Sequence, residues 1–173
     1  DIFKKKNVES GVFIEFGAWD GIHLSNCKLL ADNNWSGFFV EGDFHRFQQC
    51  QKNYKDKNKI KVVNKFIDEN YTLDDLIKNN NIKKIDLLSI DIDGNDYWVL
   101  KNIDLKSTDI VIAEYNPLFG SKLHLTIPQD DIFDRNKYNK LFYGASLPAM
   151  IELLKSKEYF FIGANKACNN AFF

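Results

Sequence analysis

The chain alternates short apolar runs with segments of helical periodicity, and this alternation constrains its fold more than any other feature. Each apolar run is four to six residues long, which suits a buried strand and is short for a buried helix. In the segments between the runs, apolar residues recur three and four positions apart, as in amphipathic helices. Strands are predicted at residues 12–16, 38–41, 60–65, 85–90 and 110–114.

Repeated alternation of strand and helix predicts a doubly wound α/β fold, with a mostly parallel sheet and helices on both faces. Asp43 is placed to cap a helix, and Ser146 caps another that has Pro148 in its first turn. The end of the chain, residues 159–162 and 171–173, predicts a closing hairpin. Further helices are predicted at residues 24–31, 73–77 and 94–103.

Length and composition indicate one ordinary domain over residues 1–173. The net charge of −1 provides no basic field for a nucleic acid, and no apolar run approaches the roughly 18 residues of a membrane span. Three widely spaced cysteines, Cys27, Cys50 and Cys168, favour free thiols and a cytoplasmic location. Met150 is the only methionine, so we expect that an N-terminal segment of the natural chain is missing here.

Polar residues follow each of the five predicted strands. In open α/β sheets, ligands bind beyond the carboxyl ends of the strands, so these residues are expected to converge on one crevice. The long segment 116–143 exceeds the usual connection length and is expected to bind substrate. The polar strand ends are residues 15–21, 41–43, 64–68, 91–96 and 114–116.

The segment EFGAWDG, residues 15–21, predicts a tight turn against a ligand. Gly17 and Gly21 allow the backbone to turn sharply and to approach a ligand closely, and Asp20 can accept from an ammonium or hydroxyl group. The spacing G-x-x-x-G differs from the G-x-G-x-x-G of pyrophosphate cradles. Glu41 ends the next strand, where an acid binds both hydroxyls of a ribose. An adenosyl cofactor without phosphate, S-adenosylmethionine, fits both features.

The segment DIDGND, residues 91–96, is open to three interpretations. A calcium loop has its glycine at the sixth position, whereas here the glycine is fourth. A D-x-D-G phosphatase usually has Thr next and the motif near the chain start, whereas Asn95 follows here in mid-chain. In the third, Asp91 lies beside a transferred methyl group and Asp93 is a base or a metal ligand; the position in the fold favours it.

Taken together, these blocks resemble the FkbM-type family of S-adenosylmethionine-dependent methyltransferases over almost the whole chain. The SIDIDGNDYW and EYN blocks are the most specific, and a stretch around Glu69 and Asn70 also matches. The remaining blocks are VFIEFGAWDGIHLSN, GFFVEGD, YGASL and NNAFF. The resemblance implies a seven-stranded, Rossmann-like methyltransferase sheet and methyl transfer to hydroxyls of sugars, glycans or small metabolites.

The resemblance also implies which residues contact the cofactor. Glu is more common in the family where Asp93 and Asp96 stand here, which puts a catalytic role for these shorter side chains in question. Ala18 in the first turn, with Asn64 and Phe66 at the end of the third strand, complete the set of expected contacts. The expected cofactor-binding residues are Glu15, Gly17, Ala18, Asp20, Gly21, Glu41, Asn64, Phe66 and Asp91.

Methyl transfer to an alcohol also needs a group that removes the hydroxyl proton. The candidates are Asp91, Asp93 and His124, the last in the long segment 116–143. A divalent metal ion bound by Asp91, Asp93 or Glu114 would lower the pKa of the acceptor hydroxyl. The partner is expected to be a sugar or another small molecule. A non-catalytic binding module with the same fold and a D-x-D-G phosphatase remain the alternatives.

Overall fold

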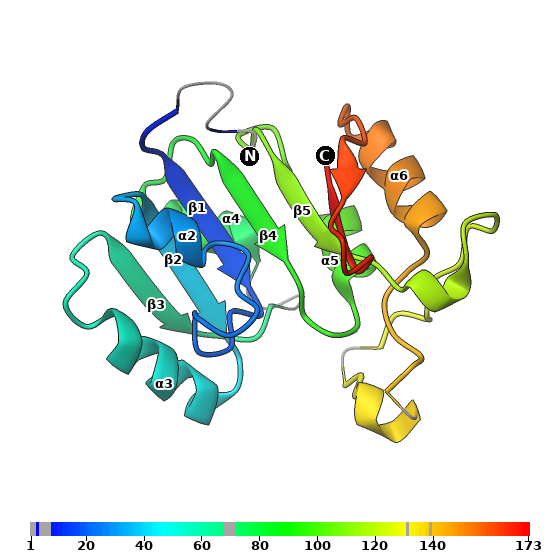
Figure 1. Cartoon of the computed structure of the whole chain (residues 1–173), viewed down its shortest axis with the longest axis horizontal. Coiled ribbons are helices and arrows are strands. Elements are labelled where there is room, and N and C mark those ends of the chain that lie inside the picture. Colours follow the sequence, from blue (N-terminus) through cyan, green and yellow to red (C-terminus); the bar gives the residue numbers. More distant parts are fainter. Residues whose placement is uncertain (1–2, 4–7, 68–71, 131, 139) are drawn as a thin grey trace.

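A computed structural model describes residues 3, 8–67, 72–130, 132–138 and 140–173. Seven strands form one sheet in the order β3-β2-β1-β4-β5-β7-β6 (Figure 1). The first five strands of this order are parallel, whereas β7 is antiparallel to both β5 and β6. The strands are β1 (Val12–Phe16), β2 (Ser36–Glu41), β3 (Ile60–Asn64), β4 (Leu87–Ile90), β5 (Val111–Glu114), β6 (Gly163–Ala164) and β7 (Asn170–Phe172).

Helices cover both faces of the sheet, which confirms the predicted doubly wound architecture (Figure 1). The helices α2 and α3 pack on one face, and α4, α5 and α6 pack on the other. The helices are α2 (Lys28–Asp32), α3 (Phe44–Tyr54), α4 (Leu73–Asn80), α5 (Asp96–Asn102) and α6 (Leu147–Ser156), with short 3-10 turns at η1 (Pro117–Phe119) and η2 (Arg135–Tyr138).

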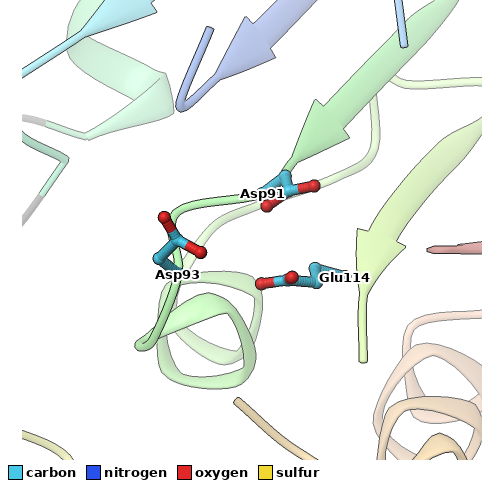
Figure 2. A group of neighbouring side chains, drawn as sticks. All are labelled: Asp91, Asp93 and Glu114. Carbon is cyan, nitrogen blue, oxygen red and sulfur yellow. The ribbon is translucent and has the colours of Figure 1, made fainter. Parts of the chain in front are cut away.

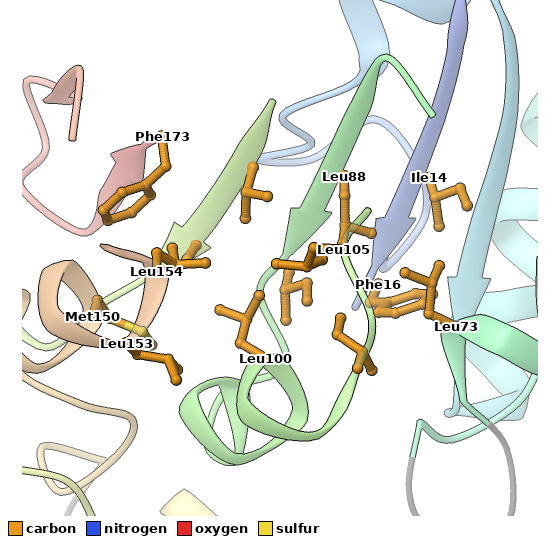
Figure 3. Packing of buried hydrophobic residues seen from close by; sticks show 14 of the residues in the cluster. Ile14, Phe16, Leu73, Leu88, Leu100, Leu105, Met150, Leu153, Leu154 and Phe173 are labelled. Atoms are coloured by element: carbon orange, nitrogen blue, oxygen red, sulfur yellow. The ribbon is translucent and has the colours of Figure 1, made fainter. Parts of the chain in front are cut away.

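The two hydrophobic cores follow from the alternation of side chains along each strand. On β1, Ile14 and Phe16 face the core formed with α4, α5 and α6, where they lie beside Leu88 and Leu73 (Figure 3). Phe13 points the other way and packs on Phe39 in the core under α2 and α3. Because both faces are buried, the central strands are almost continuously apolar, as parallel strands are.

The predicted helix at residues 24–31 begins only at Lys28, so the prediction of its start was wrong. Leu24 has a φ of 56°, which a right-handed helix cannot contain. The Ser25 hydroxyl instead accepts hydrogen bonds from the backbone N–H groups of Cys27 and Lys28, at 3.2 and 3.0 Å. This turn at Ser25 precedes the helix, whose N-cap is Cys27 and which begins one turn later than predicted.

The predicted closing hairpin exists, but its first strand is β6 (Gly163–Ala164) and not residues 159–162. Phe160 comes before β6 in the chain, and its side chain is 81% exposed. The predicted caps are confirmed: Asp43 accepts from the Arg46 N–H at the start of α3, and Ser146 accepts from Ala149 N–H at the start of α6.

The long segment 116–143 contains η1 and η2 and packs against the turn after β4. Asn95 donates to the carbonyl of Asp130 at 2.7 Å, and the Trp98 indole donates to that of Ile127 at 2.9 Å. The expected residues Asp68, Glu69 and Asn70 lie outside the described part of the chain. Among the described residues, no helix is long and apolar enough to cross a membrane.

Candidate functional site

The polar strand ends meet at the carboxyl edge of the sheet, where β1 lies between β2 and β4. Phe16 pairs with Val40 on one side and with Ile90 on the other, so the segments that follow all three strands start side by side. Glu114 ends β5, which pairs with β4. The structure thus brings the predicted strand-end residues of β1, β2, β4 and β5 to one edge.

The turn after β1 is built around its two glycines. Gly17 has a φ of 75°, and a Cβ atom there would lie 1.7 Å from the backbone oxygen of Asp91. Gly21 has a φ of 72°, and its carbonyl accepts a 2.6 Å hydrogen bond from the Tyr54 hydroxyl of α3. Only glycine fits both positions. The first turn therefore packs directly on the start of the DIDGND segment.

Glu15 is buried beneath this turn and anchors the segment that leads into α2. Its carboxylate accepts from the Ser25 hydroxyl at 2.6 Å and from the backbone N–H of Asn26 at 2.8 Å. Burial raises the pKa of Glu15 to about 7, and these hydrogen bonds oppose the rise. Both oxygens have partners within the protein, so Glu15 shapes the turn from below.

Asp20 and Glu41, both expected to contact the cofactor, also hold the turn. One Asp20 oxygen accepts from the N–H groups of Ile22 and His23, at 2.9 and 2.7 Å. Glu41 accepts from Trp19 N–H at 2.7 Å and from Asp43 N–H at 2.8 Å. Each carboxylate oxygen has more than one lone pair, so these bonds leave acceptor capacity toward a ligand.

Three further expected residues surround the end of β2. Ala18 is buried, and its N–H donates to the Val40 carbonyl at 3.2 Å. The Asn64 side chain donates to the carbonyls of Glu41 and Gly42, at 2.8 and 3.1 Å. Phe66 is 70% exposed, and its ring lies over Gly42 so closely that a Cβ there would be 2.3 Å from it. An exposed ring next to Glu41 offers a flat apolar face beside the strand ends.

A group of three carboxylates lies at the ends of β4 and β5. Figure 2 shows Asp91, Asp93 and Glu114 pointing toward one another, and one oxygen from each lies within 4.8 Å of the others. Asp96 supports this acid cluster from below, because its carboxylate accepts from the N–H groups of Ile92 and Gly94 at 2.8 and 3.0 Å. The DIDGND segment is therefore a turn whose last acid is structural.

Burial, and then the proximity of these acids to one another, raises their pKa values. Burial, followed by the charge of Asp93, raises the pKa of Asp91 to about 6. Burial, followed by the charges of Asp91, Asp96 and Asp93, raises the pKa of Glu114 to about 11. Burial and the charge of Asp91 also raise the pKa of Asp96 to about 7. Groups with such displaced pKa values are concentrated at functional sites.

Two residues that contact the acid cluster were not predicted from the sequence. Arg135 donates to the Asp93 carboxylate, and its guanidinium lies 4.0 Å from the centre of the Tyr143 ring. Asn170, the first residue of β7, pairs with Glu114 across the sheet and hydrogen-bonds Asp91. Signals existed for both: Arg135 is one of two arginines in the chain, and Asn170 lies in the NNAFF block.

The expected candidate base His124 lies next to α6. Its ring contacts Glu152 of that helix, and the neighbouring Leu125 N–H donates to the Ser146 hydroxyl at 3.0 Å. Its side chain is 53% exposed. Of the three candidate bases, Asp91 and Asp93 lie together with Glu114, whereas His124 contacts Glu152 of α6.

A doubly wound sheet with a glycine turn after β1 and an acid at the end of β2 defines a Rossmann-like, nucleotide-cofactor-binding class. Within that class, the model of the methyltransferase FkbM domain family matches residues 7–161. The chain therefore belongs to the FkbM family of methyltransferase domains, as the resemblance of its sequence blocks predicted. This assignment favours neither the phosphatase nor the non-catalytic alternative. No curated protein sequence matches the chain.

Solved methyltransferase structures share the fold. The METTL16 methyltransferase domain has a TM-score of 0.54 at 19% identity, covering 75% of this chain and 60% of that domain. An S-adenosylmethionine-dependent methyltransferase from Aquifex aeolicus has a TM-score of 0.53 at 9% identity, over 99% and 85%. One from Geobacter sulfurreducens, in complex with S-adenosylhomocysteine, has a TM-score of 0.51 at 11% identity, over 93% and 62%. The chain thus spans less than two thirds of two of these structures, and the similarity confirms the predicted fold.

Proposed function

We propose that this domain transfers a methyl group from S-adenosylmethionine to a hydroxyl of a sugar, a glycan or a small metabolite. The observation that carries the proposal is the acid cluster beside the glycine turn, in a chain of the FkbM family. The structure from Geobacter sulfurreducens, which binds S-adenosylhomocysteine, supports the choice of cofactor for this fold.

The cofactor would lie along the carboxyl ends of β1 and β2. In this arrangement Glu41 binds the ribose hydroxyls, Asp20 faces the ammonium group, and Gly17 and Gly21 let the backbone approach. Phe66 supplies an exposed ring against which adenine can stack. In this arrangement the sulfonium would lie near Asp91; the packing of Gly17 on the Asp91 backbone supports this position.

The reaction is an in-line displacement. The acceptor oxygen forms a bond to the methyl carbon while the carbon–sulfur bond breaks, leaving S-adenosylhomocysteine and a methyl ether. The hydroxyl proton passes to a carboxylate oxygen of Asp91 or Asp93, which act as general base. Much of the rate enhancement comes from positioning the two reactants and excluding water. The segment 116–143, tied to the turn after β4, is placed to hold the acceptor.

We further propose a small or sugar-like acceptor in a reducing, cytoplasmic compartment. The net charge of −1 supports an acceptor other than nucleic acid. All three cysteines are free thiols, which supports the reducing compartment.

Calorimetry with S-adenosylmethionine and S-adenosylhomocysteine tests the cofactor, and both are expected to bind. Phe66→Ala should weaken binding by about 1 kcal/mol, because it removes a stacking surface. Phe160→Ala is the matched control, since that ring is also exposed and lies at the far edge of the sheet. Glu41→Ala should cost on the order of 1–3 kcal/mol of binding free energy.

Absence of binding by either ligand at millimolar concentration would contradict the proposal. Equal losses in Phe66→Ala and Phe160→Ala would overturn the position assigned to adenine. Transfer of a labelled methyl group to a panel of sugars and nucleotide sugars tests the acceptor. Cofactor binding without transfer to any acceptor would favour a non-catalytic binding module.

A further inference from the structure

The acid cluster contains more acceptor oxygens than the protein itself satisfies. Glu114 is 5% exposed and Asn170 is 4% exposed, yet Glu114 Oε2 and Asn170 Oδ1 have no hydrogen-bond partner. Figure 2 shows the Glu114 carboxylate pointing at Asp91 and Asp93. Unsatisfied buried acceptors are costly, and nearly all buried polar groups in proteins have partners. The two oxygens indicate a ligand that offers donors or positive charge, while the Nε donor of the neighbouring Arg135 is likewise buried without a partner.

The charges of the acid cluster point to a cation. A cation binds the deprotonated forms of Asp91, Asp93 and Glu114, whose protons it displaces; these forms carry −3 together, and Arg135 contributes +1 through its ion pair with Asp93, which leaves −2. The Arg135 guanidinium meets Asp93, whereas the unpartnered oxygen belongs to Glu114. A divalent cation would balance the remaining charge.

We infer that Asp91, Asp93 and Glu114 form a binding site for a divalent cation that prefers oxygen ligands, of the Mg²⁺ or Mn²⁺ class. All three side chains supply carboxylate oxygens, the ligand type that these ions favour. One oxygen of each lies within 4.8 Å of the others. Given a metal–oxygen distance of about 2.1 Å, opposite ligands of an octahedral Mg²⁺ are about 4.2 Å apart and neighbouring ligands about 3.0 Å apart. Small side-chain movements therefore close the site on an ion.

The role of the ion rests on the proposed function. A cation at the ends of β4 and β5 lies where the acceptor hydroxyl must approach the methyl group, and it would orient that hydroxyl and lower its pKa. Positions left open by the protein would be taken by water and the acceptor. The cation would thus select acceptors that offer an oxygen ligand, such as sugar hydroxyls.

Calorimetric titration of the cofactor-free protein with MgCl₂ and MnCl₂ tests the inference directly. One divalent ion per chain is expected. Glu114→Gln should weaken Mn²⁺ binding at least about tenfold, because it removes a charged ligand. Asp93→Asn should do the same, and Asn tolerates the φ of 61° at this position. Glu152→Gln is the matched control for Glu114→Gln, because it makes the same change on an exposed side chain of α6.

Arg135→Gln should change the Mn²⁺ affinity in the opposite direction. Removing the guanidinium takes away a competing positive charge from Asp93, so Mn²⁺ should bind about threefold or more tightly. Thermal unfolding of each variant without metal shows whether the fold is retained. Asp93→Asn keeps the test usable if Glu114→Gln does not fold, because the Asp93 side chain is half exposed.

No heat from either ion at about 10 mM, roughly ten times the dissociation constant of the weakest protein calcium sites, would overturn the inference. Equal Mn²⁺ affinity in Glu114→Gln and Glu152→Gln, or weaker binding in Arg135→Gln, would also overturn it. S-adenosylhomocysteine binding is measured separately without metal. If S-adenosylhomocysteine did not bind, the proposed function would be contradicted. If it bound and no divalent ion did, only the cation site would be contradicted.

Discussion

At the scale of single residues, the carboxylates beside the first turn hold the backbone through hydrogen bonds, and Glu41 also keeps lone pairs for a ligand. Glu15 has both carboxylate oxygens bonded inside the protein, and Glu41 uses both for backbone N–H groups. The sequence predicted that Gly17 and Glu41 belong to one site. It could not show that Glu41 first satisfies the strained turn at Trp19, because that requires the distance between two strand ends.

Gly17→Ala tests how closely the first turn packs on the DIDGND segment. The substitution imposes a positive φ on alanine and drives its Cβ into the Asp91 carbonyl, so it should lower the free energy of unfolding by about 4 kcal/mol or more. Gly120→Ala is the control, because Gly120 has a similar φ of 74° and no atom within 4 Å of a Cβ. With its extended ψ of −172°, this position also favours glycine, so the variant should cost about 1–3 kcal/mol.

Urea unfolding at fixed pH measures both variants. Similar losses in the two would mean that backbone conformation alone explains the Gly17 requirement and that the close approach to Asp91 contributes nothing.

At the scale of elements, side-chain hydrogen bonds decide where helices begin and how the long segment is held. Sequence patterns predicted the start of α6 at Ser146 correctly and placed the start of α2 too early. The difference lies in the reach of the signal: Ser146 caps its own helix, whereas the start of α2 depends on Ser25, which is itself bonded to Glu15 in β1. The contact of Ser146 with Ala149 lies within a local sequence pattern, whereas the contact of Ser25 with Glu15 joins two separate elements.

Ser146→Ala should destabilise more than the loss of a helix cap. The buried Ser146 hydroxyl accepts from Ala149 and Leu125 N–H groups and donates to the Leu123 carbonyl, so its removal leaves backbone groups unpaired. We expect a loss of about 2–3 kcal/mol in the free energy of unfolding. Hydrogen exchange should also become faster at residues 123–127.

Ser156→Ala, at the other end of α6, is the matched control. Its hydroxyl only donates to the Leu153 carbonyl within the same helix, so the expected change is within about 0.5 kcal/mol. If the two variants lost equal stability, the role assigned to Ser146 in holding the long segment would be wrong.

At the scale of the whole molecule, buried acids make stability depend on pH in an unusual direction. Burial raises the pKa values of Glu15, Asp91, Asp96 and Glu114 to about 7, 6, 7 and 11. A raised carboxyl pKa means that the folded protein binds more protons than the unfolded chain, so stability is lost as pH rises through these values. The pKa values of Asp32 and Asp75 are lowered, so these groups change the free energy of unfolding only as pH falls below about 3.8.

The cofactor-free domain should therefore be more stable at pH 5 than at pH 8, because each such group contributes about 1.4 kcal/mol per pH unit between its unfolded and its folded pKa. Urea unfolding at pH 5.0, 6.5 and 8.0 measures the difference. Glu15→Gln should flatten the curve, because glutamine cannot ionise and Ser25 can turn its hydroxyl to accept. Stability that rises across this range would show that these buried acids do not control it.

The sequence by itself determined the elements, their alternation and the polar residues at the strand ends. These features follow from the local periodicity of apolar residues and from the glycines and acids next to each strand. Each of these patterns spans only a few neighbouring residues. The tertiary structure alone decided that Arg135 and Asn170 join Asp91, Asp93 and Glu114. Their meeting depends on the antiparallel placement of β7 beside β5 and on how the long segment packs, and no local pattern encodes such long-range contacts. Burial then alters the pKa values of these acids, and burial exists only in the folded chain.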